Sequence, residues 1–134
     1  MTKNLQRNNM KPKLLIVEDD DLTLKVYQFV LSKDYELTKC KNESELLNAL
    51  NEGEYDIFII DLSLIEGKNR IDIIKELRQM KKYQRAKIIV VTAHAAQIDE
   101  RNAIAAGADE FLRKPISNQD LKSALKHHTA VKDI

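Results

Sequence analysis

The sequence predicts a doubly wound α/β fold, in which helices cover both faces of a parallel sheet. The first observation is a set of three runs of four apolar residues, at 14–17, 57–60 and 88–91. Their unbroken pattern is typical of strands that are buried on both faces. The second observation is the helical pattern between the strands, because strands that alternate with helices join through right-handed crossovers into a parallel sheet.

Two weaker strands complete the predicted sheet, at 36–40 and 109–113, where alternation or shortness indicates an edge or a partly exposed position. The chain has 134 residues, which suits one compact domain. Hydrophobic residues make up 43% of it and charged residues 32%, an ordinary globular balance. We therefore expect one domain over 13–128, between an N-terminal lead-in of residues 1–12 and a C-terminal tail of residues 129–134.

Five helices are expected to accompany these strands. The first is predicted over about 22–32, with Asp20 or Asp21 as its cap. The second follows Asn42, a residue suited to the N-cap, and ends near Gly53. The buried face of the first helix is predicted to consist of Leu22, Val26, Phe29 and Val30.

The remaining three helices are predicted from periodicity and capping signals. The third covers about 71–78 and precedes the third apolar run. The fourth, over 97–106, has few large apolar residues and several alanines, so it should pack weakly. The last begins after Ser117, which forms a capping-box pattern with Asp120, and is expected to end near His127.

Charge and cysteine content exclude several classes of protein. The formal net charge is +1, from 22 basic and 21 acidic residues, so no global field favours nucleic acid or an anionic membrane. Cys40 is the single cysteine and cannot form an internal disulfide. No apolar run approaches the ~20 residues that span a bilayer, and the first ten residues lack a signal core. A cytoplasmic protein is expected.

Polar residues stand at four predicted strand ends. Glu18 and Asp19 follow the first apolar run, Asp61 the second and Thr92 the third, while Lys114 follows the last strand. In a doubly wound sheet, ligands bind beyond the carboxyl ends of the strands, where the winding direction reverses. These side chains are therefore expected to converge on one small site.

The chemistry of these residues suits a metal and a phosphoryl group. The consecutive carboxylates at 18–21 repel one another unless water or a cation intervenes, and Mg²⁺ takes one or two carboxylates together with waters. Asp61 is a candidate nucleophile, since carboxylates accept phosphoryl groups. Lys114 would neutralise phosphoryl charge. Taken singly, Asp20 is better explained as a helix cap, and Thr92 and Lys114 also have ordinary structural explanations.

Four segments together resemble a known family. Residues 15–20, 59–62, 91–95 and 106–115 resemble the signature segments of response-regulator receiver domains, the phosphoacceptor modules of two-component signalling, and the resemblance covers about 13–126. It implies a flavodoxin-like sheet of five parallel strands in the order 2-1-3-4-5, with five helices. Because the chain ends soon after the last predicted helix, it is expected to be a stand-alone, chemotaxis-Y-like receiver or one excised from a longer protein.

The resemblance implies a magnesium site and an acceptor. Asp61 is the implied phosphoacceptor and also a metal ligand. Asp19 is the implied direct ligand of Mg²⁺, and Glu18 is a ligand through water. Ser63, two residues after the acceptor, would supply its backbone carbonyl to the metal.

The resemblance also implies how the phosphoryl group is sensed. Thr92 would form a hydrogen bond with it, Lys114 would form an ion pair with it, and Phe111 matches the aromatic switch position. Ser63 and His94 flank the expected path of the hydrolytic water, so they are candidate determinants of phosphoryl lifetime. The domain would catalyse its own phosphorylation and dephosphorylation without turning over a separate substrate.

The implied partners are proteins. A phosphohistidine on a sensor histidine kinase or a histidine phosphotransfer protein would donate the phosphoryl group, and a downstream protein would bind the switched surface formed by the fourth helix, fifth strand and fifth helix. Direct binding to nucleic acid or membrane is not expected.

The sequence departs from the family in the loop after the acceptor. Ile65 stands where a proline is usual, and Asn69 stands where a glycine is usual, although asparagine also tolerates positive backbone angles. Gly67 could shift the turn. These departures concern the conformation of the loop more than its chemistry.

Three other functions fit parts of the sequence. A haloacid-dehalogenase-like phosphatase would need a second acid where Ser63 stands. A flavodoxin-like cofactor binder would need glycines and hydroxyls after the first strand, where the carboxylates would repel an anion. A receiver-shaped interaction module that works without phosphorylation stays open.

Overall fold

The computed structural model describes residues 11–66, 69–93 and 97–130 of the chain. Five parallel strands form one sheet, as the apolar runs predicted, in the order β2-β1-β3-β4-β5 that the family resemblance implied. The strands are β1 (Lys13–Val17), β2 (Glu36–Cys40), β3 (Ile57–Asp61), β4 (Lys87–Thr92) and β5 (Glu110–Arg113). The helices are α2 (Asp21–Leu31), α3 (Glu43–Glu52), α4 (Asp72–Gln79), α5 (Gln97–Ala106) and α6 (Asn118–Ala130), and the 3₁₀ turns are η1 (Leu62–Leu64) and η2 (Lys81–Tyr83).

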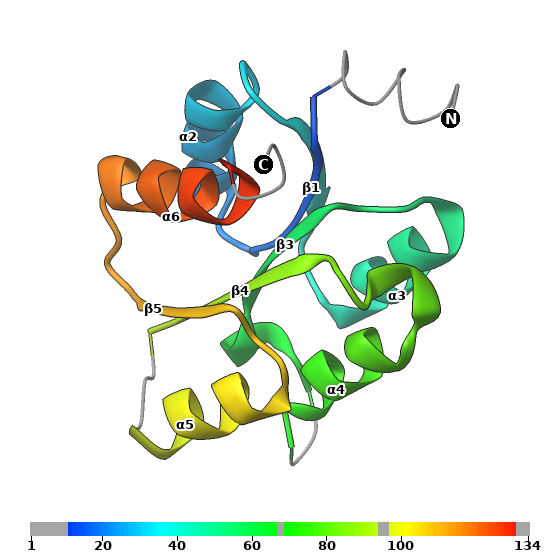
Figure 1. The fold of residues 1–134 in the computed structure, drawn as a ribbon. Helices are drawn as coiled ribbons and strands as arrows, with labels where there is room; N and C mark the ends of the chain where they lie inside the picture. Colours follow the sequence, from blue (N-terminus) through cyan, green and yellow to red (C-terminus); the bar gives the residue numbers. More distant parts are fainter. Residues whose placement is uncertain (1–10, 67–68, 94–96, 131–134) are drawn as a thin grey trace.

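Helices cover both faces of the sheet. In Figure 1, α2 and α6 lie together on one side of the strands, and α3, α4 and α5 lie on the other. The flavodoxin-like, doubly wound fold is therefore confirmed. No helix in the described part of the chain is long and apolar enough to cross a bilayer.

Two hydrophobic clusters explain the unbroken apolar runs. In β3, Phe58 and Ile60 belong to the cluster under α3, α4 and α5, whereas Ile57 and Ile59 belong to the cluster under α2 and α6. Successive side chains of a strand point to opposite faces of the sheet. A central strand that is covered on both faces must consequently be apolar at every position, which is the pattern that predicted the fold.

The helix caps follow the sequence signals. The side chain of Asp20 caps α2 by accepting from the backbone N–H of Thr23 at 2.8 Å. Asn42 caps α3 in the same way, accepting from the N–H of Glu45 at 2.8 Å. Each cap satisfies a helix-terminal N–H that has no partner within the helix, so both helices begin where the sequence predicted.

The predicted buried face of α2 is wrong for two of its residues. Leu22 is 70% exposed and Phe29 is 88% exposed, while the helix buries Leu24, Tyr27 and Leu31. The helix has apolar residues on two faces, and helical periodicity gives both a similar spacing. Only packing against the sheet decides which face turns inward.

The last two helices differ in how well they match expectation. The bounds of α5 agree with the prediction, and its described buried side chain is the small Ala103, in keeping with the expected weak packing. Ser117 caps α6 as predicted, because its Oγ accepts from the N–H of Asp120 at 3.0 Å. This helix runs past His127 to Ala130, and the hydroxyl of Thr129 donates to the carbonyl of Leu125 at 2.8 Å in its last turn.

Candidate functional site

Two buried carboxylates lie side by side at the carboxyl edge of the sheet. In the parallel register, Val17 of β1 pairs with Ile60 of β3, so the residues that follow them, Glu18 and Asp61, come level with each other. Glu18 is 3% exposed and Asp61 is 4% exposed. Burying two carboxylates is costly unless they have charged or hydrogen-bonding partners.

Lys114 provides that partner for both acids. Its Nζ lies 2.7 Å from Glu18 Oε1 and 2.8 Å from Asp61 Oδ2. The lysine follows β5 and its amide donates to the carbonyl oxygen of Thr92 at 3.0 Å, which aligns it with the end of β4. The structure thus brings Glu18, Asp61 and Lys114 together as predicted, and Thr92 contacts Lys114 through its backbone. The peptide bond from Lys114 to Pro115 is cis.

The two acids stabilise the protonated form of Lys114. Burial by itself would lower the pKa of this ammonium, but hydrogen bonds and Coulombic attraction from Asp61 and Glu18 raise the pKa above its ordinary value. Lys114 therefore stays protonated throughout the neutral pH range. The site thus presents one fixed positive charge between two carboxylates.

Ser63 fixes the other oxygen of Asp61. Its backbone N–H and its hydroxyl donate to Asp61 Oδ1 at 2.9 and 2.6 Å. Since Oδ2 faces Lys114, both oxygens of the carboxylate are oriented by named donors. Such orientation is what a nucleophile needs when positioning supplies most of the rate.

The other oxygen of Glu18 accepts from the backbone N–H of Asp20 at 3.0 Å. Asp20 itself is exposed, and the pKa of its carboxyl is lowered by the hydrogen bonds from the Thr23 side chain and backbone. Its helix-capping role is therefore confirmed. Asp19 is also exposed and lies between these two residues at the rim of the site.

The predicted switch residues lie on the two neighbouring strands β4 and β5. Thr92 is buried at the end of β4, beside β5 in the sheet register. Phe111 is partly buried and packs against the cluster under α3, α4 and α5. His94 and Gly67 lie outside the described residues.

The donor set fits a hard divalent cation. Glu18 and Asp61 both contact one ammonium, so their oxygens already face a common point, and Lys114 neutralises only one of their two charges. The described residues contain no ready-made group of three or more acidic, histidine or cysteine side chains placed to hold a metal. Magnesium commonly uses one or two carboxylates and completes its shell with water, so the residues present fit Mg²⁺.

The loop after Asp61 is held by contacts that the sequence did not predict. Ile65 is buried, and its amide donates to the carbonyl oxygen of Leu62 at 3.1 Å, a bond that the usual proline could not make. Glu43 Oε1, at the start of α3, accepts from the amide of Glu66 at 3.0 Å. Periodicity and capping signals carry no information about such a contact, because it joins residues far apart in the sequence.

A family model for the response regulator receiver domain matches residues 14–126. The chain belongs to this family. The match covers all five strands and most of α6, so the receiver assignment applies to the whole described fold.

Solved receiver structures are similar along almost the whole chain. A putative response regulator from Chloroflexus aurantiacus has 28% identity and a TM-score of 0.78, with 90% of this chain and 99% of that chain covered. The receiver domain of a sensor histidine kinase from Pseudomonas aeruginosa, solved with a magnesium ion coordinated in its active-site cleft, has 25% identity and a TM-score of 0.73, with 88% and 97% covered. A CheY-like receiver domain protein from Methanospirillum hungatei has 22% identity and a TM-score of 0.82, with 92% and 98% covered.

Proposed function

We propose that this receiver domain accepts a phosphoryl group on Asp61 from a phosphohistidine, with Mg²⁺ bound at the same site. The observation that carries the proposal is the contact of Lys114 with both Asp61 and Glu18 at the carboxyl edge of the sheet. A buried carboxylate oriented beside a fixed ammonium is suited to attack a phosphoryl group and to offset the charge that it brings.

The transfer is a displacement at phosphorus. An oxygen of Asp61 forms the new P–O bond as the P–N bond to the donor imidazole breaks, and the bonding electron pair stays on the imidazole nitrogen. Lys114 pairs with the phosphoryl oxygens, and the Thr92 hydroxyl donates a hydrogen bond to them. Water later attacks phosphorus, releases phosphate and regenerates the carboxylate, so the domain resets itself without a separate substrate.

Asp19, Asp61 and the backbone carbonyl of Ser63 would hold the magnesium ion, and Glu18 would contribute through water. The bound ion would neutralise charge on the phosphoryl oxygens. The magnesium in the cleft of the Pseudomonas aeruginosa receiver domain, which is 25% identical, supports this assignment. In this chain, the Asp19→Asn variant should require a higher magnesium concentration for phosphorylation than the unaltered protein.

The output of the reaction is a changed surface on α5, β5 and α6. Thr92 would move toward the phosphoryl group, and Phe111 would pack further inward. The partial burial of Phe111 and the small buried side chain of α5 support this switch. Among the described residues, neither α5 nor β5 has a large, fully buried side chain that would fix it in place. Amide shifts on this surface that do not respond to phosphorylation would contradict it.

The donor is proposed to be a sensor histidine kinase or a histidine phosphotransfer protein, and the receiver of the signal a downstream protein. Leu22 and Phe29 are exposed on α2, whose first turn adjoins Asp20 at the site, and exposed apolar side chains of this size support docking of a protein. The Phe29→Ser variant should lose transfer from its protein donor and keep transfer from a small phosphodonor. The cytoplasmic location and the absence of nucleic-acid or membrane binding stay predictions.

Intact mass measurement tests the proposal directly. The protein is incubated with a small phosphodonor and Mg²⁺, beside the Asp61→Ala variant and a sample containing chelator. Gain of one labile phosphoryl group by the unaltered protein alone, and only with Mg²⁺, is the expected result. No gain from small donors or from a panel of histidine kinases would instead favour the interaction module that works without phosphorylation.

A further inference from the structure

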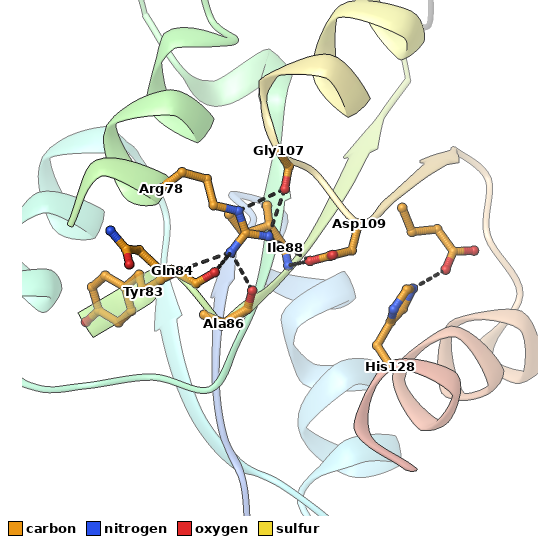
Figure 2. A network of polar contacts seen from close by, with 9 residues as sticks. Arg78, Tyr83, Gln84, Ala86, Ile88, Gly107, Asp109 and His128 are labelled. Atoms are coloured by element: carbon orange, nitrogen blue, oxygen red, sulfur yellow. Dashed lines mark hydrogen bonds and ion pairs between the residues drawn. The ribbon is translucent and has the colours of Figure 1, made fainter. Parts of the chain in front are cut away.

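The side chain of Arg78 contacts the segments that lead into β4 and β5 (Figure 2). These segments lie at the amino edge of the sheet, whereas Asp61 ends β3 at the carboxyl edge. Nε and Nη2 donate to the carbonyl oxygen of Gly107 at 3.0 and 2.8 Å, and Nη2 also pairs with Asp109 Oδ2 at 2.9 Å. The arginine thus ties the last turn of α4 to the segment between α5 and β5. Nη1 donates to the carbonyl oxygens of Tyr83, Gln84 and Ala86, at 3.0, 3.3 and 2.6 Å, in the segment that leads into β4.

The segment between α5 and β5, residues 107–109, is shaped around this arginine, and we name it the α5–β5 corner. Gly107 has φ +123°, a conformation that L side chains rarely adopt, and a Cβ there would lie 2.7 Å from Arg78 Cγ. Asp109 Oδ2 accepts from the amide of Ile88 as well, at 2.8 Å, and the Asp109 amide donates to the Ile88 carbonyl at 2.8 Å. The corner is therefore bonded both to α4 and to β4.

The described contacts of the other end of α5 are weaker. Glu100 pairs with Arg113 at 2.9 Å, and these side chains are 48% and 53% exposed. Exposed ion pairs contribute little to stability, because water and salt screen them. Arg113 precedes Lys114, so this pair links the first half of α5 to the lysine that contacts Asp61. The Arg78 side chain, in contrast, is 20% exposed and makes charge-assisted bonds to several carbonyls.

We infer that α5 works as a lever whose fixed end is the α5–β5 corner and that Arg78 is the positioning residue that holds this end. Phosphorylation at Asp61 moves the half of α5 near Glu100, where Arg113 provides the link to Lys114, while the corner keeps its bonds to α4 and β4. The inference rests on the proposed function. It adds that the movement of α5 ends at the α5–β5 corner and that Arg78 keeps this corner in place.

The first test follows backbone amides of the full chain by NMR. Mg²⁺ and beryllofluoride, a stable stand-in for the phosphoryl group, are added to the ¹⁵N-labelled protein. The amides of Glu100 and Arg101 should shift, whereas those of Gly107, Ala108 and Asp109 should stay in place. Shifts at the corner as large as those at Glu100 would overturn the lever.

The second test removes the anchor. In Arg78→Gln, hydrogen exchange at the Asp109 and Ile88 amides should become at least about tenfold faster, because charge-assisted bonds that hold the corner are lost. Arg78→Lys keeps the charge but lacks the planar guanidinium, so its exchange rates should lie between those of the unaltered protein and those of Arg78→Gln. Arg85→Gln removes an exposed arginine from the same region and should leave exchange unchanged. Unchanged exchange in Arg78→Gln would refute the anchoring role.

A further readout separates the lever from a purely structural contribution. With beryllofluoride, Arg78→Gln should show shifts that spread into the corner, while its phosphorylation by a small donor stays within about twofold of the unaltered rate, since the arginine is remote from Asp61. Shifts that stay confined as in the unaltered protein would count against the lever. If Arg78→Gln does not fold, Arg78→Lys carries the same comparison.

The same NMR experiment distinguishes failure of the proposed function from failure of the lever. Beryllofluoride that shifts no amide near Asp61, including those of Leu62 and Ser63, would reject the phosphoacceptor function and the lever with it. Shifts at Leu62 and Ser63 accompanied by equal shifts at the corner would reject the lever alone.

Discussion

Replacing Lys114 with methionine should destabilise the protein by about 3 kcal/mol, because it leaves two buried carboxylates without their shared cation. The ammonium lies 2.7 Å from Glu18 and 2.8 Å from Asp61, whose side chains are 3% and 6% exposed. At an effective dielectric constant of about 20, each contact corresponds to an attraction of about 6 kcal/mol. Water that enters beside the partly exposed lysine stem offsets much of this, so the loss should approach the lower end of the ~3–5 kcal/mol typical of a broken buried pair.

The assay is urea unfolding followed by far-ultraviolet circular dichroism, at neutral pH with chelator present so that no divalent cation replaces the lysine. A loss of about 3 kcal/mol lowers the urea midpoint by about 1–2 M for a domain of this size. Lys122→Met removes an exposed lysine from α6 and should change the midpoint little. The double variant with Glu18→Gln should recover part of the loss, because one uncompensated carboxylate is then absent. If Lys114→Met matches Lys122→Met, the bridging role assigned to Lys114 is incorrect.

Three further predictions concern single side chains. Ser63→Ala removes the hydrogen bond of 2.6 Å from the hydroxyl to Asp61. A bond of this kind contributes about 1 kcal/mol, so the decay rate of the acyl phosphate should change by about fivefold, and equal decay in both proteins would exclude Ser63 as a determinant of phosphoryl lifetime. Burial raises the pKa of the Cys40 thiol to about 11, so at intermediate pH the thiol is neutral in the folded chain and ionised in the unfolded chain. The free energy of unfolding should therefore hold below about pH 9 and fall by about 2–3 kcal/mol toward pH 11, and this fall should be smaller in Cys40→Ala. Gly107→Ala should cost about 2–3 kcal/mol in chemical unfolding, because φ is +123° and its Cβ would lie 2.7 Å from Arg78 Cγ. Gly53→Ala is the control for backbone strain, since its φ is −160° and its Cβ would meet only the end of the Tyr55 side chain, at 3.2 Å from the hydroxyl; equal losses would contradict the strain argument.

Local signals in the sequence were sufficient for most of the architecture. The run Ile57–Ile60 could be assigned to a central strand because both faces of such a strand are buried, and the caps Asp20 and Asn42 could be placed because a helix N-terminus leaves unpaired N–H groups. The candidate site followed from the same reasoning. Once parallel strands are inferred, residues at their carboxyl ends must share one edge of the sheet.

The buried face of a helix and the contacts between residues distant in sequence could not be predicted in this way. Leu22 and Phe29 of α2 have helical spacing, but they face solvent, because the sheet packs against Leu24, Tyr27 and Leu31 instead. The bond between Glu43 and Glu66 joins residues that are 23 positions apart and leaves no periodic signal. The same holds for Arg78 and Gly107, which are 29 positions apart.

The sequence by itself determined the order of strands and helices, the edge of the sheet that carries the site, and the residues that stand there. These features depend on local periodicity and capping, which act within a few residues. The tertiary structure alone decided that Lys114 bridges Glu18 and Asp61, which face of α2 is exposed, and that Arg78 fixes the α5–β5 corner. Each of these depends on distances between segments remote in sequence, and those distances are set only when the two hydrophobic clusters close on the sheet.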